Sequence, residues 1–402
     1  MYRLICLLLP LSLCLQTLAA PPVINNVRAS QRPGTKLVDI YYDLSDADGD
    51  LQLVQVAASS DAGLTYGIPC VTLTGAVGAN VSQGTNRHIV WNAGADWDGN
   101  WVAQCRVRVT AHDGTTPPAP PGMVYIPPGP FQMGDNLDDG STDELPVHTV
   151  QLSGYFMDKK EVTKELWEQV KAWGNNNGYS IAGGAAKASG HPVYGVNWYN
   201  AAIWCNARSA REGLTPCYYT DEAQTIIYKG GSVNLTNTMV KWSANGYRLP
   251  TEAEWEKAAR GGRTGQRFPH GNTISHSDAN FANSGNEPYQ SGTTGFHPAY
   301  VPYSPFTSPA GSFPQNDYGL FDMAGNVPEW VWDWYDGAFY GNSDSLNDPV
   351  GPQTGSSRAI RSADWRDYAT NCRCSDRYAL IPSSSSWNTN SPRRLGFRAV
   401  RK

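Results

Sequence analysis

Two cysteines near the C-terminus, Cys372 and Cys374, form a Cys-x-Cys motif. Thiolates are soft ligands that select Cu(I) and similar ions, so a Cys-x-Cys motif can in principle hold a soft metal. In an oxidising compartment the same thiols form disulfides instead. Because the N-terminus indicates export, we expect each of the two to pair with Cys205 or Cys217 rather than to bind a metal.

A second constellation lies between Asp322 and Glu329, which bracket a turn that contains Gly325. Two carboxylates and the carbonyls between them are the oxygen ligands that a hard cation such as Ca²⁺ prefers. The segment therefore predicts a calcium site, and the alternative is a salt-bridged turn.

An acidic run near the N-terminus has a similar composition. Asp46, Asp48 and Asp50 occupy the first ligand positions of an EF-hand-like loop, but Leu51–Leu53 begins a strand where the later acidic ligand should stand. A tight turn is the interpretation that we favour over a calcium loop.

Other catalytic motifs are absent from the sequence. The seven histidines form neither a His-x-x-x-His pair nor a His-Glu ligand motif, so non-haem iron lacks its ligands. Gly-x-Ser-x-Gly, Gly-x-x-x-x-Gly-Lys and Gly-x-Gly-x-x-Gly do not occur either. His191 and His297 each precede a proline, where histidine more often caps a turn than transfers protons.

The composition is that of a globular chain with many loops. The 402 residues include 14 Trp, 21 Tyr, 40 Gly and 28 Pro, which suit an irregular backbone held by large aromatic anchors. The net charge is −5 and no cluster of Lys and Arg occurs, so we expect neither nucleic acid nor an anionic membrane as a partner.

Residues 1–20 have the pattern of a cleaved signal peptide, with Arg3, an apolar run over 4–15 and small residues at 18–20. The run is too short for a membrane anchor, and no other segment is apolar enough to span a bilayer. We therefore expect a secreted, periplasmic or cell-surface protein. Six cysteines remain after cleavage, and we predict a Cys70–Cys105 disulfide, while the other four allow three pairings.

The elements that must position these residues fall into two regions. Short runs rich in Val, Ile, Tyr and Thr, separated by turn signals, predict a β-sandwich of fibronectin or immunoglobulin type over residues 22–114. A proline-rich linker follows at 115–121.

The second region covers residues 122–402 and contains three predicted helices. They begin at Thr163, at about Tyr199 and at Thr251, and they end near Trp173, at Arg211 and at Gly261. Thr251 and Glu254 form a capping box, which satisfies the first amides of the third helix. Long segments rich in Gly, Pro, Ser and Asn lie between and after the helices, as is typical of functional or cross-linked loops.

Residues 122–402 resemble the sulfatase-modifying-factor family, also known as formylglycine-generating-enzyme-like domains. Matching blocks occur in the family's order at Gly122–Gly134, Glu144–His148, His191–Trp198, Tyr247–Gly262, Tyr318–Trp330 and Leu395–Arg398. The resemblance implies a mixed α/β, C-type-lectin-like fold with little regular secondary structure.

The resemblance also implies structural calcium. At the place where family members bind calcium, the ligands here would be Asp322, Gly325, Val327 and Glu329, the middle two through backbone carbonyls. A second family site would begin at Asn280 and Phe281, although its remaining ligands fall where this chain departs from the family in length.

The family's oxidase chemistry needs two nearby cysteines that bind copper and activate oxygen to oxidise a cysteine of a sulfatase. The matching stretch is 361–377, and alignment on Trp365 places Asp367 at the first cysteine and Cys372 at the second. Alignment on Arg373 and Cys374 places Ala369 at the second. Neither register restores the pair, so we do not expect copper.

Two hypotheses follow for the function. The first is a non-catalytic module that binds a protein, peptide or glycan in the family's substrate groove. The second is a divergent formylglycine-generating oxidase that uses Cys372 or Cys374. We expect the groove to be lined by Asp364, Trp365, Asp367, Tyr368, Arg373, Arg377 and Trp387.

Overall fold

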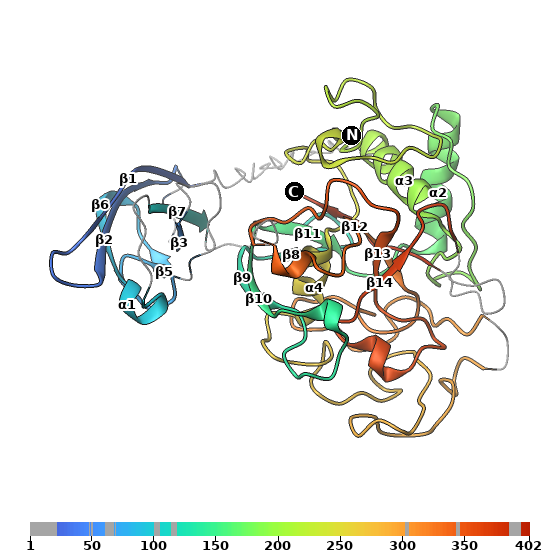
Figure 1. Cartoon of the computed structure of the whole chain (residues 1–402). Coiled ribbons are helices and arrows are strands. Elements are labelled where there is room, and N and C mark those ends of the chain that lie inside the picture. Colours follow the sequence, from blue (N-terminus) through green and yellow to red (C-terminus); the bar gives the residue numbers. More distant parts are fainter. Residues whose placement is uncertain are drawn as a thin grey trace, which may run out of the picture. The chain divides into compact units, whose positions relative to one another are not determined.

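The computed structural model describes residues 22–47, 49, 51–60, 68, 70–99, 105–113, 119–301, 305–342, 346–385 and 395–402. The predicted signal peptide, Asp48, Asp50, Trp387 and linker residues 115–118 lie outside this set. The chain divides into two compact units, one formed mainly by residues that precede Pro118 and one mainly by Pro118–Lys402 (Figure 1). No helix in the described ranges is long and apolar enough to cross a membrane.

The first unit is built from β-strands, as the alternating runs predict. Its inner face is apolar, with Ile40, Tyr42, Ile89 and Trp91 buried at alternate positions of their strands and more exposed residues between them. One sheet has the order β1-β2-β6-β4 and the other the order β5-β3-β7. The strands are β1 (Val23–Gln31), β2 (Leu37–Ser45), β3 (Gln52–Ser59), β4 (Leu73–Gly75), β5 (Gly78–Val81), β6 (Gly84–Asn92) and β7 (Arg106–Asp113), and the short helix α1 spans Ala93–Asp96.

The predicted Cys70–Cys105 disulfide is not formed in the structure. Cys105 is exposed just before β7, whereas Cys70 is partly buried before β4, so the two side chains occupy different environments.

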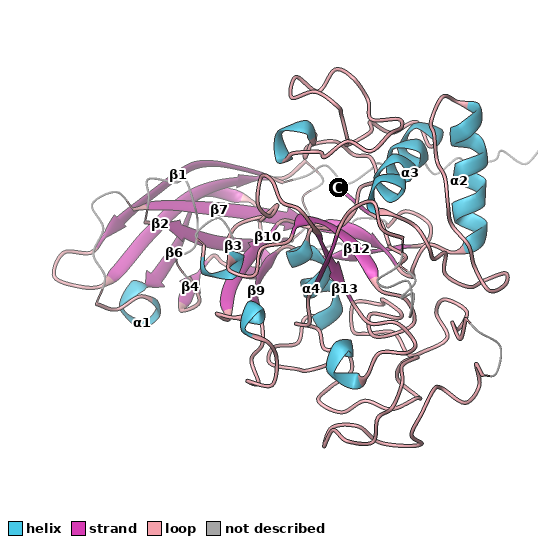
Figure 2. Cartoon of the chain, turned by 45° about the vertical axis from the view of Figure 1, so that its right-hand side comes forward, coloured by secondary structure: helices cyan, strands magenta, loops and turns pink. Residues whose placement is uncertain are grey.

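The second unit combines short strands, few helices and long loops (Figure 2). Its sheets have the orders β10-β9, β15-β11-β8 and β12-β13-β14. The expected opening strand is split in two, because Pro127 and Pro128 interrupt it and cannot donate to a ladder. The strands are β8 (Met123–Ile126), β9 (Gly129–Met133), β10 (His148–Leu152), β11 (Tyr155–Asp158), β12 (Glu329–Trp334), β13 (Arg358–Arg361), β14 (Tyr378–Leu380) and β15 (Val400–Arg401).

The three predicted helices of this unit are confirmed as α2 (Lys164–Asn176), α3 (Trp198–Arg211) and α4 (Glu252–Arg260). The Thr251 hydroxyl accepts the Glu254 amide while the Glu254 carboxylate accepts the Thr251 amide, which completes the capping box. Gly261 ends α4 with φ +60°, a left-handed conformation that favours glycine. Local sequence therefore determines where these helices begin and end.

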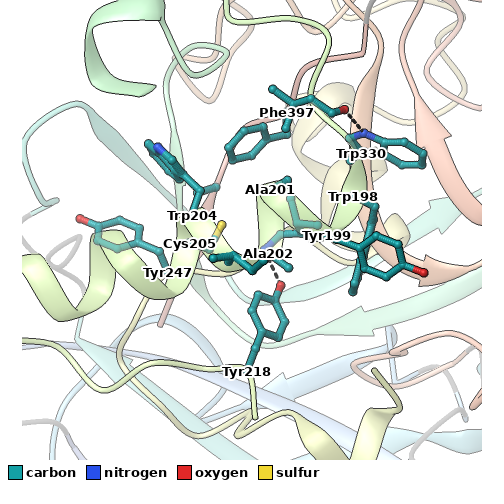
Figure 3. Close-up of a cluster of buried hydrophobic side chains, with 14 of the residues drawn as sticks. Trp198, Tyr199, Ala201, Ala202, Trp204, Cys205, Tyr218, Tyr247, Trp330 and Phe397 are labelled. Atoms are coloured by element: carbon teal, nitrogen blue, oxygen red, sulfur yellow. Dashed lines mark hydrogen bonds between the residues drawn. The ribbon is translucent and has the colours of Figure 1, made fainter. Parts of the chain in front are cut away.

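Tryptophans hold the irregular backbone around α3, as the aromatic content predicts. The indole N–H of Trp198 donates to the Val331 carbonyl at 2.9 Å, and that of Trp330 donates to the Val196 carbonyl at 2.8 Å. Trp204 packs against Phe397 at the end of the chain (Figure 3). Each ring thus fills the core and satisfies a loop carbonyl at the same time.

Candidate functional site

The segment 361–377, where the family carries its reactive cysteines, is fastened to α4 by buried ion pairs. Glu252 of α4 accepts Arg377 Nη2 at 2.7 Å and Arg361 Nη1 at 3.1 Å. Glu256, one helical turn later, accepts Arg361 Nη2 at 2.8 Å. Burial by itself would raise the pKa of Glu252, but the charges of Arg377 and Arg361 outweigh it and lower that pKa. Both carboxylates therefore stay ionised and hold the segment in place.

The same segment is also tied to the short 3-10 helix η1 (Thr142–Glu144). Arg373 Nη2 donates to Glu144 Oε1 at 2.7 Å, and its Nε donates to the Thr370 carbonyl at 2.9 Å. We predicted that Arg373 and Arg377 line a ligand groove, and this prediction is wrong. Both guanidinium groups are buried and use their donors on the protein itself.

Asp364, Trp365 and Asp367 are also buried, contrary to the groove prediction. Asp364 accepts the Arg366 amide at 2.7 Å, and Asp367 accepts the Asp364 amide at 2.9 Å, so both carboxylates stabilise the local turn. The Trp365 ring packs on Tyr194. Of the predicted groove residues that the structure describes, only Tyr368 is exposed, with 53% of its surface accessible.

Cys372 and Cys374 are buried in different hydrophobic clusters. Cys372 lies with Phe281 and Ala369, whereas Cys374 lies with Trp255. Burial raises the pKa of Cys372 well above its usual value and raises the pKa of Cys374 to about 12. Neither thiol becomes a thiolate near neutral pH, and the thiolate is the form that binds metals and attacks substrates.

The predicted pairing of these two cysteines with Cys205 or Cys217 is also wrong in this structure. Cys205 and Cys217 belong to the Trp-rich core around α3, a cluster that contains neither Cys372 nor Cys374. None of the cysteines in the described ranges forms a disulfide.

The predicted calcium turn is assembled in part. Gly325 lies against Asn280, whose carbonyl accepts the Asn326 amide at 2.8 Å, so the two predicted calcium segments are neighbours. Gly325 has φ +75°, and an added Cβ would come within 2.3 Å of the Asn280 carbonyl oxygen. Asp322, on the same turn, has φ +54° and a buried Oδ1 that lacks a hydrogen-bond partner. A buried carboxylate oxygen that has no hydrogen-bond partner is chemically suited to ligate a cation.

Glu329, the fourth predicted ligand, faces Arg398 instead. Its Oε1 accepts Arg398 Nη2 at 2.7 Å, and its Oε2 accepts Arg398 Nε at 2.8 Å and Trp255 Nε1 at 2.9 Å. Both oxygens of Glu329 are therefore used within the protein, which does not fit the prediction that Glu329 is a calcium ligand.

The Phe281 carbonyl of the second predicted calcium site is paired with the ring of His276, at 3.1 Å from Nε2. The Asn280 amide nitrogen donates to the Phe306 carbonyl at 2.8 Å, while its Oδ1 is buried without a partner. Across the described ranges, no group of three or more His, Cys, Asp or Glu side chains is arranged to hold a metal ion.

Glu161 is a buried carboxylate of this region that the sequence reasoning missed. Its Oε2 accepts the Asn326 side chain at 2.8 Å and its Oε1 accepts the Val327 amide at 3.2 Å. Burial raises its pKa, and the nearby charges of Asp322 and Glu329 raise it further. The sequence signal was weak, because a Glu shortly before a helix start is usually solvated.

The ion-pair carboxylates of α4 had a clearer signal. Glu252 and Glu256 are spaced i, i+4 and therefore share one face of the helix. We interpreted this block as architecture, which its contacts bear out, but we did not connect it with Arg361 and Arg377.

The chain is similar to known proteins both in sequence and in structure. The chain is 32% identical over 294 residues to the formylglycine-generating enzyme of Streptomyces coelicolor, covering 69% of this chain and 88% of the relative. It is also 32% identical over 284 residues to serine/threonine-protein kinase Pkn1 of Chlamydia trachomatis, but this match spans only 36% of the relative. The solved structure of Treponema denticola variable protein 1 superimposes with a TM-score of 0.51 and 31% identity, covering 69% of this chain and 94% of that one.

The family comparison extends the predicted domain slightly toward the N-terminus. Residues 110–402 match the model of the sulfatase-modifying factor enzyme 1-like domain, whereas we placed the boundary at 122. This match covers more than half of the chain, and the matching relatives include formylglycine-generating enzymes. The chain therefore belongs to the sulfatase-modifying factor (FGE-sulfatase) family.

Proposed function

We propose that this protein is a non-catalytic member of its family that binds a protein, peptide or glycan partner. The observation that carries the proposal is the burial of Cys372 and Cys374 in separate clusters with raised pKa values. Copper-dependent oxidation needs two thiolates that face one ion. The raised pKa values disfavour the thiolate form, and the separate clusters do not bring the two sulfurs to one ion.

The partner would contact the surface of segment 361–377 near Tyr368 rather than a groove lined by its arginines. An exposed aromatic side chain on a rigidly held loop is typical of a binding surface, because aromatic rings supply contact area at a low entropic cost. The related chains include a formylglycine-generating enzyme and a serine/threonine-protein kinase, which is consistent with a fold that carries more than one function.

The oxidation chemistry is tested with a peptide substrate. The reduced full-length chain is incubated with Cu(I), oxygen and a Cys-x-Pro-x-Arg peptide, and mass spectrometry is used to detect an aldehyde. The Streptomyces coelicolor relative serves as the positive control. We expect no aldehyde from this chain. Aldehyde formation that disappears in Cys372→Ser or Cys374→Ser would establish the alternative, a divergent formylglycine-generating oxidase.

Calcium remains part of the proposal as a structural ligand. Asp322 Oδ1 and the carbonyls of Gly325 and Val327 would hold it, and the ion would offset buried negative charge on this turn. We expect the melting temperature to fall when a chelator is added and to recover with Ca²⁺, with no such response in Asp322→Asn. Equal melting temperatures with and without chelator would contradict a bound ion.

Export by a cleaved signal at residues 1–20 is likewise proposed, on the apolar run and small residues of that segment. N-terminal sequencing of the mature protein tests it, with a new N-terminus after Ala20 as the expected result. The two-sheet first unit supports a sandwich of fibronectin or immunoglobulin type.

A further inference from the structure

A small pocket lies in the second unit, away from segment 361–377. Its volume is about 220 Å³, and it is lined by the end of β10, the start of α4, the segment 348–350 and Lys402. Pockets for drug-sized ligands usually measure about 300–1,000 Å³, so this one matches a single small ring.

The wall of the pocket is mainly apolar. The apolar residues that line it are Leu152, Trp242, Pro349 and Val350. Arg248 lies over the Trp242 ring, 5.3 Å from its centroid, which helps to fix the orientation of the indole.

The rim of the pocket carries hydrogen-bonding groups. Asp348 accepts the amide and the hydroxyl of Ser153, each at 2.6 Å, which leaves further acceptor positions on both carboxylate oxygens. Thr251 and Lys402 also line the pocket. Asp348 has φ +38°, a strained conformation for a residue other than glycine, and such strain is often found at binding sites.

The charges of the pocket are balanced. Arg248 donates to both oxygens of Glu254, at 2.6 and 2.7 Å, so these buried groups neutralise each other. The remaining pair is Asp348 and Lys402, one negative and one positive. A ligand with a net charge would be attracted by one of these two residues and repelled by the other. A neutral ligand with hydroxyl groups could donate a hydrogen bond to Asp348 and accept one from Lys402.

From this combination we propose that the pocket binds a neutral, polyhydroxylated ring, that is, one pyranose unit of a sugar. The apolar face of the sugar packs on the Trp242 wall, and its hydroxyls donate to Asp348 and accept from Lys402. This site is independent of the proposed partner surface near Tyr368.

The test uses saturation-transfer NMR on the full-length chain with methyl glycosides of glucose, galactose, mannose and N-acetylglucosamine. Glucuronate and glucosamine serve as charged counterparts. We expect at least one neutral glycoside to bind saturably and more tightly than the charged sugars. Trp242→Ala removes the apolar wall and Asp348→Asn removes the charged hydrogen-bond acceptor, so each should weaken binding at least about tenfold.

Trp173→Ala, on α2 outside the pocket, is the matched control and should bind like the wild type. Asp348→Asn is the safer of the two pocket variants, because its exposed side chain is not part of the core. The proposal is overturned if no neutral glycoside binds, if the charged sugars bind equally well, or if binding survives Asp348→Asn unchanged.

Discussion

Glu252 is the residue on which the position of segment 361–377 depends most. Its carboxylate accepts three hydrogen bonds, from Arg361 Nη1 at 3.1 Å, Arg377 Nε at 2.8 Å and Arg377 Nη2 at 2.7 Å, and all three side chains are buried. The variant Glu252→Gln keeps the shape of the side chain but removes its charge, so that two buried guanidinium groups lose their shared counterion.

Breaking a buried ion pair from one side destabilises a protein by about 3–5 kcal/mol, because the remaining charge stays buried without compensation. For a domain of this size, each kcal/mol lowers the melting temperature by about 2 °C or more. We therefore expect Glu252→Gln to lower the calorimetric transition of the second unit by at least about 6 °C.

Two further variants make this prediction specific. Glu168→Gln is the matched control, because Glu168 is an exposed helical residue 4.0 Å from Lys171, and we expect its effect to stay below about 0.5 kcal/mol. In the double variant Glu252→Gln, Arg377→Met, Arg361 keeps Glu256 at 2.8 Å, so part of the loss should be recovered. A melting temperature of Glu252→Gln within 2 °C of the wild type would refute the reasoning.

Three more predictions concern buried ionisable groups. Burial lowers the pKa of Lys257 to about 7, so above that pH the unfolded chain binds more protons than the folded chain. The free energy of unfolding should therefore rise by up to about 1.4 kcal/mol per pH unit between pH 7 and 10. Denaturant titrations of Lys257→Met should lack this contribution. Burial raises the pKa of Asp376 to about 8, so between pH 4 and 8 the folded chain holds a proton that the unfolded chain has lost. The free energy of unfolding therefore falls as the pH rises through this range. Asp376→Asn should raise the melting temperature at pH 8 more than at pH 4. Mass mapping of alkylation should label exposed Cys105 first and label Cys372 and Cys374 only after unfolding, and rapid native labelling of either would contradict their burial.

The helices of the second unit were predictable because their signals are local. Thr251 and Gly261 mark the two ends of α4 through contacts within one turn, and the structure places them as cap residues. The aromatic content likewise predicted a loop-rich core held by rings, which Trp198 and Trp330 bear out through their hydrogen bonds to loop carbonyls.

The burial of the arginines that we predicted to line a groove could not be inferred from the sequence. Arg373 and Glu144 are 229 positions apart, and Arg377 and Glu252 are 125 positions apart, so no spacing rule connects them. An arginine next to a functional motif looks the same in sequence whether it faces a ligand or a buried glutamate. Only the fold shows that these guanidinium groups are satisfied by the protein.

The ion pairs also explain how this domain holds segment 361–377 in place. Arg361 and Arg377 hold both ends of the segment through Glu252 and Glu256, and none of these contacts involves a thiol or a bound metal. We therefore expect substitutions between the anchors to leave the backbone of the segment in place. For this reason family membership indicates the scaffold of residues 110–402 more directly than it indicates an oxidase.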